Sequence, residues 1–229
     1  GGIWQNVYLE STGKIIIEDL FIKPDIYKKQ SEIDFKIVNK YTQEKNTILI
    51  NKIFNNKGVE INKQETKILL QPGINKISQI IRLNEISLWS PNNPSLYKLK
   101  SYIKIKDKTE DIVFENFGFR EFTVKDDRFY LNDKPIYLKA AFFEGLYPIK
   151  LAHPDSKEMV IKEIMMAKKA GFNMIRPWRK PPPPMWLKIA DSLGVLTVGS
   201  MAIECMDMPI ETPYLPRRVE NEITESILR

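Results

Sequence analysis

The sequence predicts a multidomain chain in which an all-β immunoglobulin-like sandwich precedes the first βα units of an incomplete TIM (β/α)8 barrel. Three observations support this prediction. Residues 15–122 hold short segments whose apolar residues recur with a period of two, as in strands buried on one face. Residues 155–198 alternate helical apolar stripes with short apolar runs, as in parallel βα units. The chain has 229 residues, more than most single domains need.

The β region divides at turn signals into about seven short strands. Residues 31–40, 46–55 and 97–105 alternate apolar and polar side chains, and turn sequences rich in Pro, Asn and Gly separate such runs. The inward-facing residues of the first run are Ile33, Phe35 and Ile37. About seven strands in roughly a hundred residues are typical of an immunoglobulin-like sandwich. The Cys-Trp-Cys spacing of antibody domains is missing from the sequence.

The pattern changes after Phe122, where a hairpin is expected. Arg128–Leu131 and Ile136–Ala141 flank the polar turn Asn132–Pro135. We expect the second arm to continue as an apolar strand, residues 136–138, that ends near Glu144. The predicted domains are residues 1–10 as the end of a preceding β-sandwich, 11–122 as the immunoglobulin-like sandwich and 123–229 as the N-terminal part of the barrel.

Helices and strands alternate in the second half. A helix is expected from Asp155 to Gly171, because apolar residues fall at i, i+4 and i+7. A buried strand, residues 172–175, follows the glycine and ends in Arg176. A second helix, Met185–Ser192, stops at Gly194, a strand covers residues 195–198, and a last helix carries an apolar stripe. Its members are Val219, Ile223 and Ile227.

A closed barrel needs eight strands and about 250 residues, so the barrel predicted here is incomplete. The chain begins with no initiator methionine and no basic leader, and we therefore expect it to start inside a longer protein. No apolar run reaches about 18 residues, so no membrane span is predicted. The location stays open, with the periplasm or secretion favoured for a bacterial source.

Charge and metal-binding residue types exclude several classes of function. The net charge of +6 comes from 35 basic and 29 acidic residues. The lysines lie mostly at alternating strand positions, so solvated sheet faces explain them and nucleic acid is not an expected partner. One cysteine, Cys205, and one histidine, His153, can form neither an internal disulfide nor a Cys/His zinc site.

Five segments, in the right order, resemble glycoside hydrolase family 2, which includes β-galactosidases, β-glucuronidases and β-mannosidases. Residues 1–9, GGIWQNVYL, resemble the end of that family's sugar-binding domain. Two segments resemble its middle domain: residues 88–97, LWSPNNPSLY, and residues 117–122, FGFREF. Residues 129–135, FYLNDKP, resemble the hairpin that opens its catalytic barrel. Residues 170–176, AGFNMIR, and residues 190–195, ADSLGV, resemble the second and third βα units of that barrel.

The resemblance implies a retaining exo-β-glycosidase that uses two carboxylates about 5 to 5.5 Å apart. In the family the acid/base glutamate follows the fourth barrel strand and the nucleophile comes later, so no catalytic residue is expected within this chain, and the chain alone should be inactive. A carbohydrate substrate, no cofactor, no metal and a possible homo-oligomer formed through further domains are expected. Two alternatives stay open: a non-catalytic carbohydrate-binding or scaffolding module, and an unrelated barrel enzyme, whose mark would be a glycine-rich phosphate loop.

Five residues are candidates for contacting substrate. Arg176, at a strand end, would orient the nucleophile and the sugar, or would form an ion pair. Trp178 would stack on a pyranose ring. Glu204 matches a galactosidase metal ligand, but the partner histidines are absent, so a substrate hydrogen bond or a structural role is expected. Glu144 would hydrogen-bond a sugar hydroxyl or lie at the surface. Arg179 is a solvated loop residue or would bind a uronic carboxylate.

Two departures from the family leave the sugar open. Residues 139–144, KAAFFE, stand where galactosidases and glucuronidases carry Arg-Gly followed by Asn-x-His. Residues 176–178, RPW, are nearer to the Arg-x-Trp of the mannosidase branch. Trp186, inside the second helix, is expected in the core. Of Phe142 and Phe143, only one can face the barrel interior, because consecutive strand residues point to opposite sides.

Overall fold

The computed structural model of the protein describes residues 7–151, 153–177, 181–200 and 213–227. It divides into two compact units. One holds Tyr8–Ile136, and the other holds the described residues from Tyr137 onward together with Val7. None of the described helices is long and apolar enough to cross a membrane.

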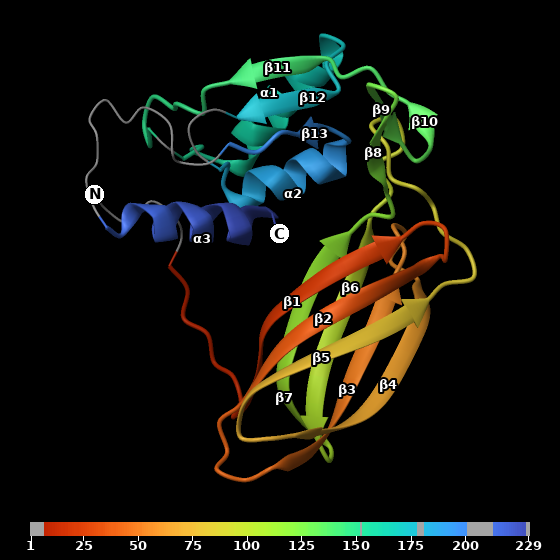
Figure 1. The fold of residues 1–229 in the computed structure, drawn as a ribbon, viewed down its shortest axis with the longest axis vertical. Coiled ribbons are helices and arrows are strands. Elements are labelled where there is room, and N and C mark those ends of the chain that lie inside the picture. Colours follow the sequence, from red (N-terminus) through yellow and green to blue (C-terminus); the bar gives the residue numbers. More distant parts are fainter. Residues whose placement is uncertain (1–6, 152, 178–180, 201–212, 228–229) are drawn as a thin grey trace. The chain divides into compact units, whose positions relative to one another are not determined.

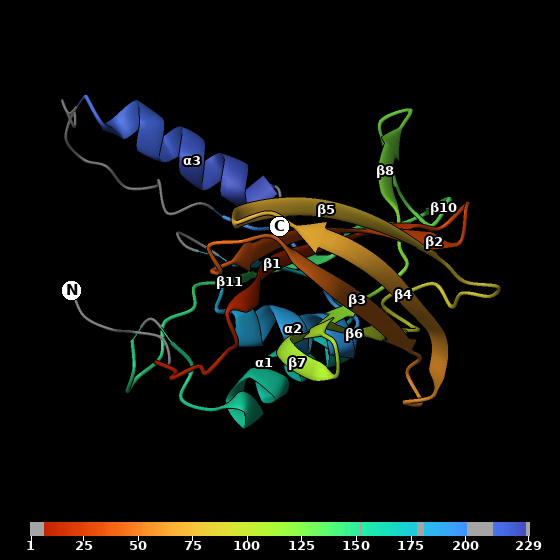
Figure 2. The same ribbon diagram turned by 90° about the horizontal axis from the view of Figure 1, so that it is seen from below.

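The first unit is a sandwich of two antiparallel sheets, which Figures 1 and 2 show as two layers. The three-stranded sheet has the order β1-β2-β5, and the four-stranded sheet has the order β4-β3-β6-β7. The strands are β1 (Ile15–Asp25), β2 (Gln30–Asn39), β3 (Lys45–Phe54), β4 (Glu60–Leu70), β5 (Gly73–Arg82), β6 (Tyr97–Ile105) and β7 (Lys108–Phe117). The seven strands agree with the sandwich predicted from the period of two.

Alternating side chains of the two sheets fill the core of the sandwich. Ile33, Phe35 and Ile37 are all at most 2% exposed, so the predicted inward face of β2 is confirmed. At one end of the core, three aromatic rings contact each other with centroids 5.3 to 5.6 Å apart. They belong to Tyr97, Phe117 and Phe119.

A small three-stranded sheet follows the sandwich, with the order β10-β9-β8. Its strands are β8 (Phe122–Lys125), β9 (Arg128–Leu131) and β10 (Lys134–Pro135). The predicted hairpin therefore exists, but its second arm was placed wrongly at Ile136–Ala141. The turn residues Asn132 and Asp133 both have positive φ, 53° and 62°, so pairing resumes at once with Lys134 opposite Leu131.

The strand predicted at residues 136–138 is also wrong, because the strand begins later, as β11 (Ala140–Phe143). The Asn173 side chain satisfies the backbone just before it. Asn173 Nδ2 donates to the Tyr137 carbonyl at 2.9 Å, and its Oδ1 accepts from the Lys139 amide at 2.8 Å. A side chain thus replaces a strand partner over these residues, and the Tyr137 ring is 82% exposed.

Asn132 connects the hairpin to the sandwich. Its Nδ2 donates to the Trp89 carbonyl at 3.0 Å, its Oδ1 accepts from the Glu121 amide at 3.0 Å, and its own amide donates to the Glu121 carbonyl at 2.8 Å. Trp89 is fully buried, and the Arg120 guanidinium lies 4.7 Å from its ring centroid. Three segments that are far apart in the sequence therefore meet around one asparagine.

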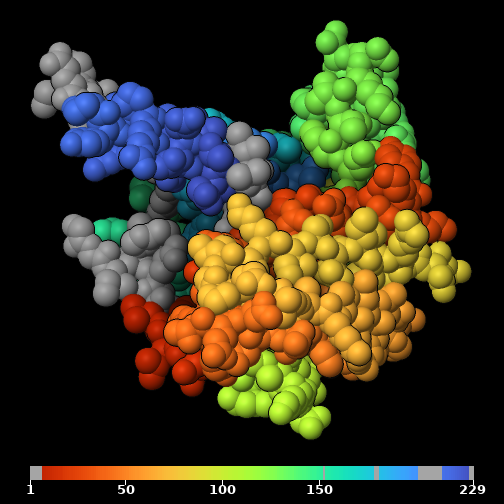
Figure 3. All heavy atoms as spheres, turned by 60° about the horizontal axis from the view of Figure 1, so that its bottom comes forward, coloured from red at the N-terminus to blue at the C-terminus, as the bar shows by residue number. Residues whose placement is uncertain are grey.

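Tyr27, in the turn between β1 and β2, makes a second connection to the hairpin. Its hydroxyl donates to the Glu121 carboxylate and lies 3.0 Å from both Asp133 carboxylate oxygens. The two carboxylates raise the pKa of the Tyr27 hydroxyl, chiefly through the hydrogen bond to Glu121. Figure 3 shows the hairpin residues, in green, as a projection beside the red strands of this sandwich.

The second unit contains a parallel sheet with the order β11-β12-β13, whose strands alternate with two helices. After β11 come α1 (Lys157–Lys169), β12 (Met174–Pro177), α2 (Pro184–Leu193), β13 (Leu196–Thr197) and finally α3 (Leu215–Ile227). Ser156 caps α1 by accepting a hydrogen bond from the Met159 amide, and Gly194 ends α2 with a φ of 74°. The predicted alternation of three strands with helices is present.

Candidate functional site

The three parallel strands end at one edge of their sheet. In register, Phe142 of β11 lies opposite Arg176 of β12, and Ile175 lies opposite Thr197 of β13. Side chains that follow the carboxyl ends of parallel strands gather where the βα loops meet, and in open α/β sheets and barrels this edge binds ligands. The sequence predicted two described candidates at this edge, Arg176 and Glu144.

The two faces of this sheet differ. Helices α1 and α2 pack on one face, where Val160, Ile164, Ile175 and Trp186 are all less than 5% exposed. The other face presents Phe142, which is 56% exposed, beside Arg176. Trp186 is therefore a core residue as predicted, and Phe143 stacks on its ring at a centroid distance of 5.6 Å.

Arg176 is held on a rigid strand end. Its neighbours Ile175 and Pro177 are buried, while Arg176 itself is exposed. The Val198 amide donates to the Ile175 carbonyl at 3.2 Å, and the Ser200 hydroxyl donates to the Pro177 carbonyl at 2.8 Å. The strand backbone on both sides of Arg176 is thus hydrogen-bonded, which holds the Cα of this permanent cation at the strand end.

Glu144 follows β11 directly and is exposed. The residues around it hold the chain in place: Phe143 packs on Trp186, and Gly145 turns the chain with a φ of 69°. A carboxylate at this position is a hydrogen-bond acceptor that directly follows the carboxyl end of β11, the strand that pairs with β12. The other three predicted contacts, Trp178, Arg179 and Glu204, lie outside the described residues.

A contact in the second unit between the buried Tyr147 and the half-buried Glu163 was not predicted. The Tyr147 hydroxyl donates to Glu163 Oε2 at 3.2 Å, and so ties the segment after Glu144 to helix α1. Burial raises the pKa of the Glu163 carboxyl, although the Tyr147 hydrogen bond lowers it. Burial likewise raises the pKa of Tyr147, aided by the nearby Glu163 charge. No local sequence pattern marks this contact, since its partners are 16 residues apart.

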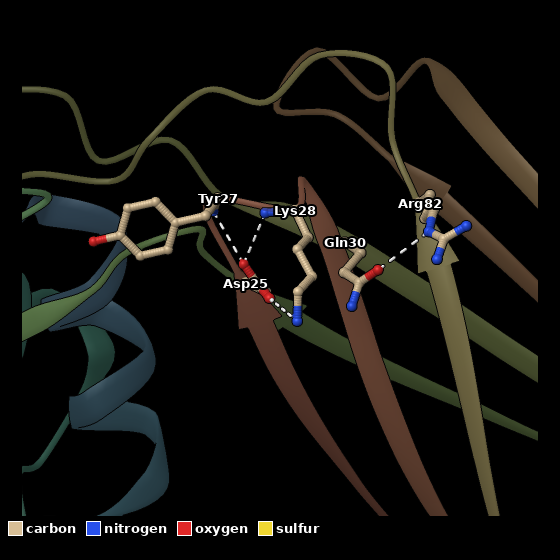
Figure 4. Close-up of polar contacts among 5 residues, drawn as sticks. All are labelled: Asp25, Tyr27, Lys28, Gln30 and Arg82. Carbon is tan, nitrogen blue, oxygen red and sulfur yellow. Dashed lines mark hydrogen bonds and ion pairs between the residues drawn. The ribbon is translucent and has the colours of Figure 1, made fainter.

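The sandwich has a pocket of its own, with a volume of about 360 Å³, at the turn between β1 and β2. Asp25 organises this turn by accepting hydrogen bonds from the Tyr27 and Lys28 amides at 3.0 and 2.8 Å, and Lys28 Nζ lies 3.4 Å from its carboxylate. In Figure 4 the Tyr27 ring points away from Asp25, and Arg82 donates to Gln30 nearby. The Asp25 and Lys28 charges that line this pocket are therefore engaged within the turn.

Among the described residues, no group of three or more His, Cys, Asp or Glu side chains is arranged to hold a metal ion.

Residues 15–120 match the model of the family described as glycosyl hydrolases family 2. The β-galactosidase of Streptococcus thermophilus is 25% identical over 207 residues, which are 89% of this chain and 19% of that protein. The β-galactosidase of Thermoanaerobacterium thermosulfurigenes is 28% identical over 202 residues, 86% of this chain and 28% of that protein. The chain thus spans about a fifth to somewhat over a quarter of the length of these relatives.

Solved structures share the fold. A glycosyl hydrolase family 2 member from Bacteroides cellulosilyticus superimposes with a TM-score of 0.84 at 20% identity, over 95% of this chain and 29% of that one. A β-glucuronidase from Bacteroides uniformis gives a TM-score of 0.81 at 21% identity, over 93% of this chain and 27% of that one. At these identities the likeness concerns the fold.

Proposed function

Because the chain belongs to glycoside hydrolase family 2, we propose that it is part of a retaining exo-β-glycosidase. In this proposal residues 1–10 end a sugar-binding β-sandwich, residues 11–122 are the middle sandwich, and residues 123–229 begin the catalytic TIM barrel. The observation that carries it is the order of the elements. A sandwich that matches the family is followed, in one chain, by three parallel strands alternating with helices.

The catalytic carboxylates and the sugar-binding residues have separate roles in this proposal. Retaining hydrolysis needs one carboxylic acid to protonate the leaving oxygen and one carboxylate to attack the anomeric carbon. We propose that both carboxylates come from strands beyond Arg229. The residues present here would then bind and orient the sugar: Arg176 as a cation facing the nucleophile and the substrate, and Glu144 as an acceptor for a hydroxyl.

Three further contacts complete the proposed sugar site. Trp178 would stack on a pyranose face, Arg179 would approach a uronic carboxylate, and Glu204 would accept a hydroxyl hydrogen bond. The relatives quoted above are named β-galactosidases and a β-glucuronidase, so these two glycosides are the first substrates to test. β-Mannosides join the panel because of the Arg176-Pro177-Trp178 sequence.

The test is a kinetic comparison in the longer protein that contains this chain. Arg176→Ala should lower kcat/KM on nitrophenyl β-glycosides by on the order of a hundredfold or more, because a charged contact to the transition state is lost. Lys162→Ala, which removes an exposed cation from α1, is the matched control and should leave kcat/KM unchanged. Equal effects of the two substitutions, or saturable saccharide binding with no hydrolysis, would contradict the proposal.

A further inference from the structure

The outward face of the four-stranded sheet carries an unbalanced positive charge. The outward positions of β3, β4, β6 and β7 hold two glutamates, Glu60 and Glu65, and six lysines. The lysines are Lys52, Lys63, Lys67, Lys98, Lys100 and Lys104. We call this set of eight residues, with the aromatic residues between them, the lysine face. It lies entirely within the described part of the chain.

Like charges stand directly opposite each other on the lysine face. Lys52 of β3 pairs with Lys63 of β4 on one side and with Lys100 of β6 on the other. Neighbouring strands are about 4.8 Å apart, and like charges directly opposite are destabilising. Two outward positions further along β3, Lys67 and Lys104 lie on either side of Ile48. The row Lys63-Lys52-Lys100 therefore concentrates positive charge on one face of the sheet, which favours anions nearby.

The two glutamates neutralise only part of this charge. Lys52 Nζ lies 2.7 Å from Glu60, and Lys63 Nζ lies 2.6 Å from Glu65. These contacts lower the pKa of the Glu65 carboxyl and raise that of Lys63, in both cases chiefly through their mutual hydrogen bond. Among the described residues, the other four lysines have no carboxylate within ion-pair distance. Four cations are thus available to an anionic ligand.

Aromatic rings lie between the cations. Lys100 Nζ is 5.7 Å from the Tyr102 ring centroid and 5.4 Å from that of Phe114, and Lys104 Nζ is 5.6 Å from Tyr102. The Phe114 side chain is 57% exposed. A ring face beside a cation suits a carboxylated sugar, because the pyranose C–H groups can pack on the ring while the carboxylate meets the ammonium group.

The opposite outward face of the sandwich provides an internal comparison. On β1, β2 and β5 two of the outward lysines are paired with acids: Lys23 lies 2.8 Å from Asp34, and Lys36 contacts Glu18. Acids stand opposite cations between β1 and β2, with Lys23 opposite Glu32 and Asp19 opposite Lys36, and the one lysine pair of this face is Lys36 opposite Lys76 of β5. Two sheets of one sandwich therefore differ in charge balance, and solvation alone gives no reason for the difference.

We propose that the lysine face binds an acidic polysaccharide, a polymer of uronic acid residues whose carboxylates pair with the lysine rows. Charge complementarity selects a polyanion. The outward positions of these four strands hold lysine and no arginine, whereas arginine is the preferred residue for phosphate and nucleic-acid recognition. The inference goes beyond the proposed glycosidase activity, because these residues bind the glycan and cleave no bond.

Binding of the 229-residue chain to polygalacturonate at low ionic strength tests the inference, with neutral dextran, poly-L-glutamate and a single-stranded oligodeoxynucleotide as comparisons. Polygalacturonate should bind most tightly, dextran should not bind, and added salt should weaken binding by screening. Replacing Lys67, Lys100 and Lys104 together by Gln should weaken binding about tenfold or more, because each lost contact costs roughly two- to fivefold. Lys100→Gln alone, which breaks no ion pair, should show the single step.

The matched control is the triple substitution of Lys23, Lys36 and Lys76 by Gln on the opposite face, which removes the same charge. It should leave polygalacturonate binding unchanged. Equal weakening by both triple variants would show an effect of overall charge and overturn the inference. So would binding of poly-L-glutamate or the oligodeoxynucleotide at least as tight as that of polygalacturonate, or no binding of polygalacturonate at low ionic strength.

Discussion

Asn132→Ala should destabilise the first unit by about 2–4 kcal/mol, because one substitution removes two kinds of stabilisation. The first is hydrogen bonding to the sandwich: the side chain donates to the Trp89 carbonyl and accepts from the Glu121 amide, both at 3.0 Å. Each such bond contributes about 0.5–1.5 kcal/mol. The second is backbone conformation, since Asn132 has a φ of 53° and asparagine tolerates this region better than alanine by about 1 kcal/mol.

Two further variants separate these contributions. Asn132→Gly loses the same hydrogen bonds without the conformational cost, so it should be about 1 kcal/mol less destabilising than Asn132→Ala. Asp126→Ala is the matched control, because Asp126 has a φ of 48° in the turn between β8 and β9 and the substitution should cost only the conformational part.

Urea unfolding combined with hydrogen exchange of residues 8–136 measures these differences in the unit concerned. Exchange at the Glu121 amide, which Asn132 binds directly, should accelerate in Asn132→Ala and stay unchanged in Asp126→Ala. If Asn132→Ala costs no more than Asp126→Ala, the idea that Asn132 fastens the hairpin to the sandwich is wrong.

Two other predictions concern packing and pH. Gly13→Ala should destabilise the sandwich by about 1–3 kcal/mol in urea unfolding. The reason is that an added Cβ would lie 2.9 Å from the Glu110 carbonyl oxygen and closer still to the buried Glu110 carboxylate. Gly199→Ala is the control and should be nearly neutral, because an added Cβ there has nothing within 4 Å. Burial raises the folded-state pKa of Glu163, so its contribution to stability is present at low pH and lost as pH rises through that pKa. Glu163→Gln should therefore gain stability over the parent chain in thermal unfolding as pH rises above about 4, the ordinary pKa of a glutamate, and a gap that shrinks with rising pH would contradict the assignment.

Much of the fold could be predicted because its signals are local. The alternation of residues such as Ile33, Phe35 and Ile37 is visible in the sequence and follows from a sheet with one buried face. Helix α2 could be placed because Gly194 ends it in a left-handed conformation that glycine adopts without strain. The start of β11 could not be predicted, because it depends on the Asn173 side chain. This side chain hydrogen-bonds the backbone of Tyr137 and Lys139, more than 30 positions away in the sequence.

The candidate site shows the same division. Arg176 and Glu144 could be placed after strand ends because the spacing of strands and helices is local. The Tyr147–Glu163 contact could not be predicted, because it joins a loop to a helix without a pattern in either. The sequence shows that lysines alternate on their strands, but the lysine row depends on register. Only the pairing of β3 with β4 and β6 sets Lys63, Lys52 and Lys100 side by side.

The most direct test of the central claim is the anomeric configuration of the first sugar released. Nuclear magnetic resonance would follow hydrolysis of nitrophenyl β-galactoside and β-glucuronide by the longer protein, with the 229-residue chain assayed beside it. A retaining β-glycosidase with its carboxylates beyond Arg229 predicts that the longer protein releases the β-anomer first and that the 229-residue chain releases no nitrophenol. Release of the α-anomer first, or turnover by the 229-residue chain that Glu144→Gln abolishes, would contradict it.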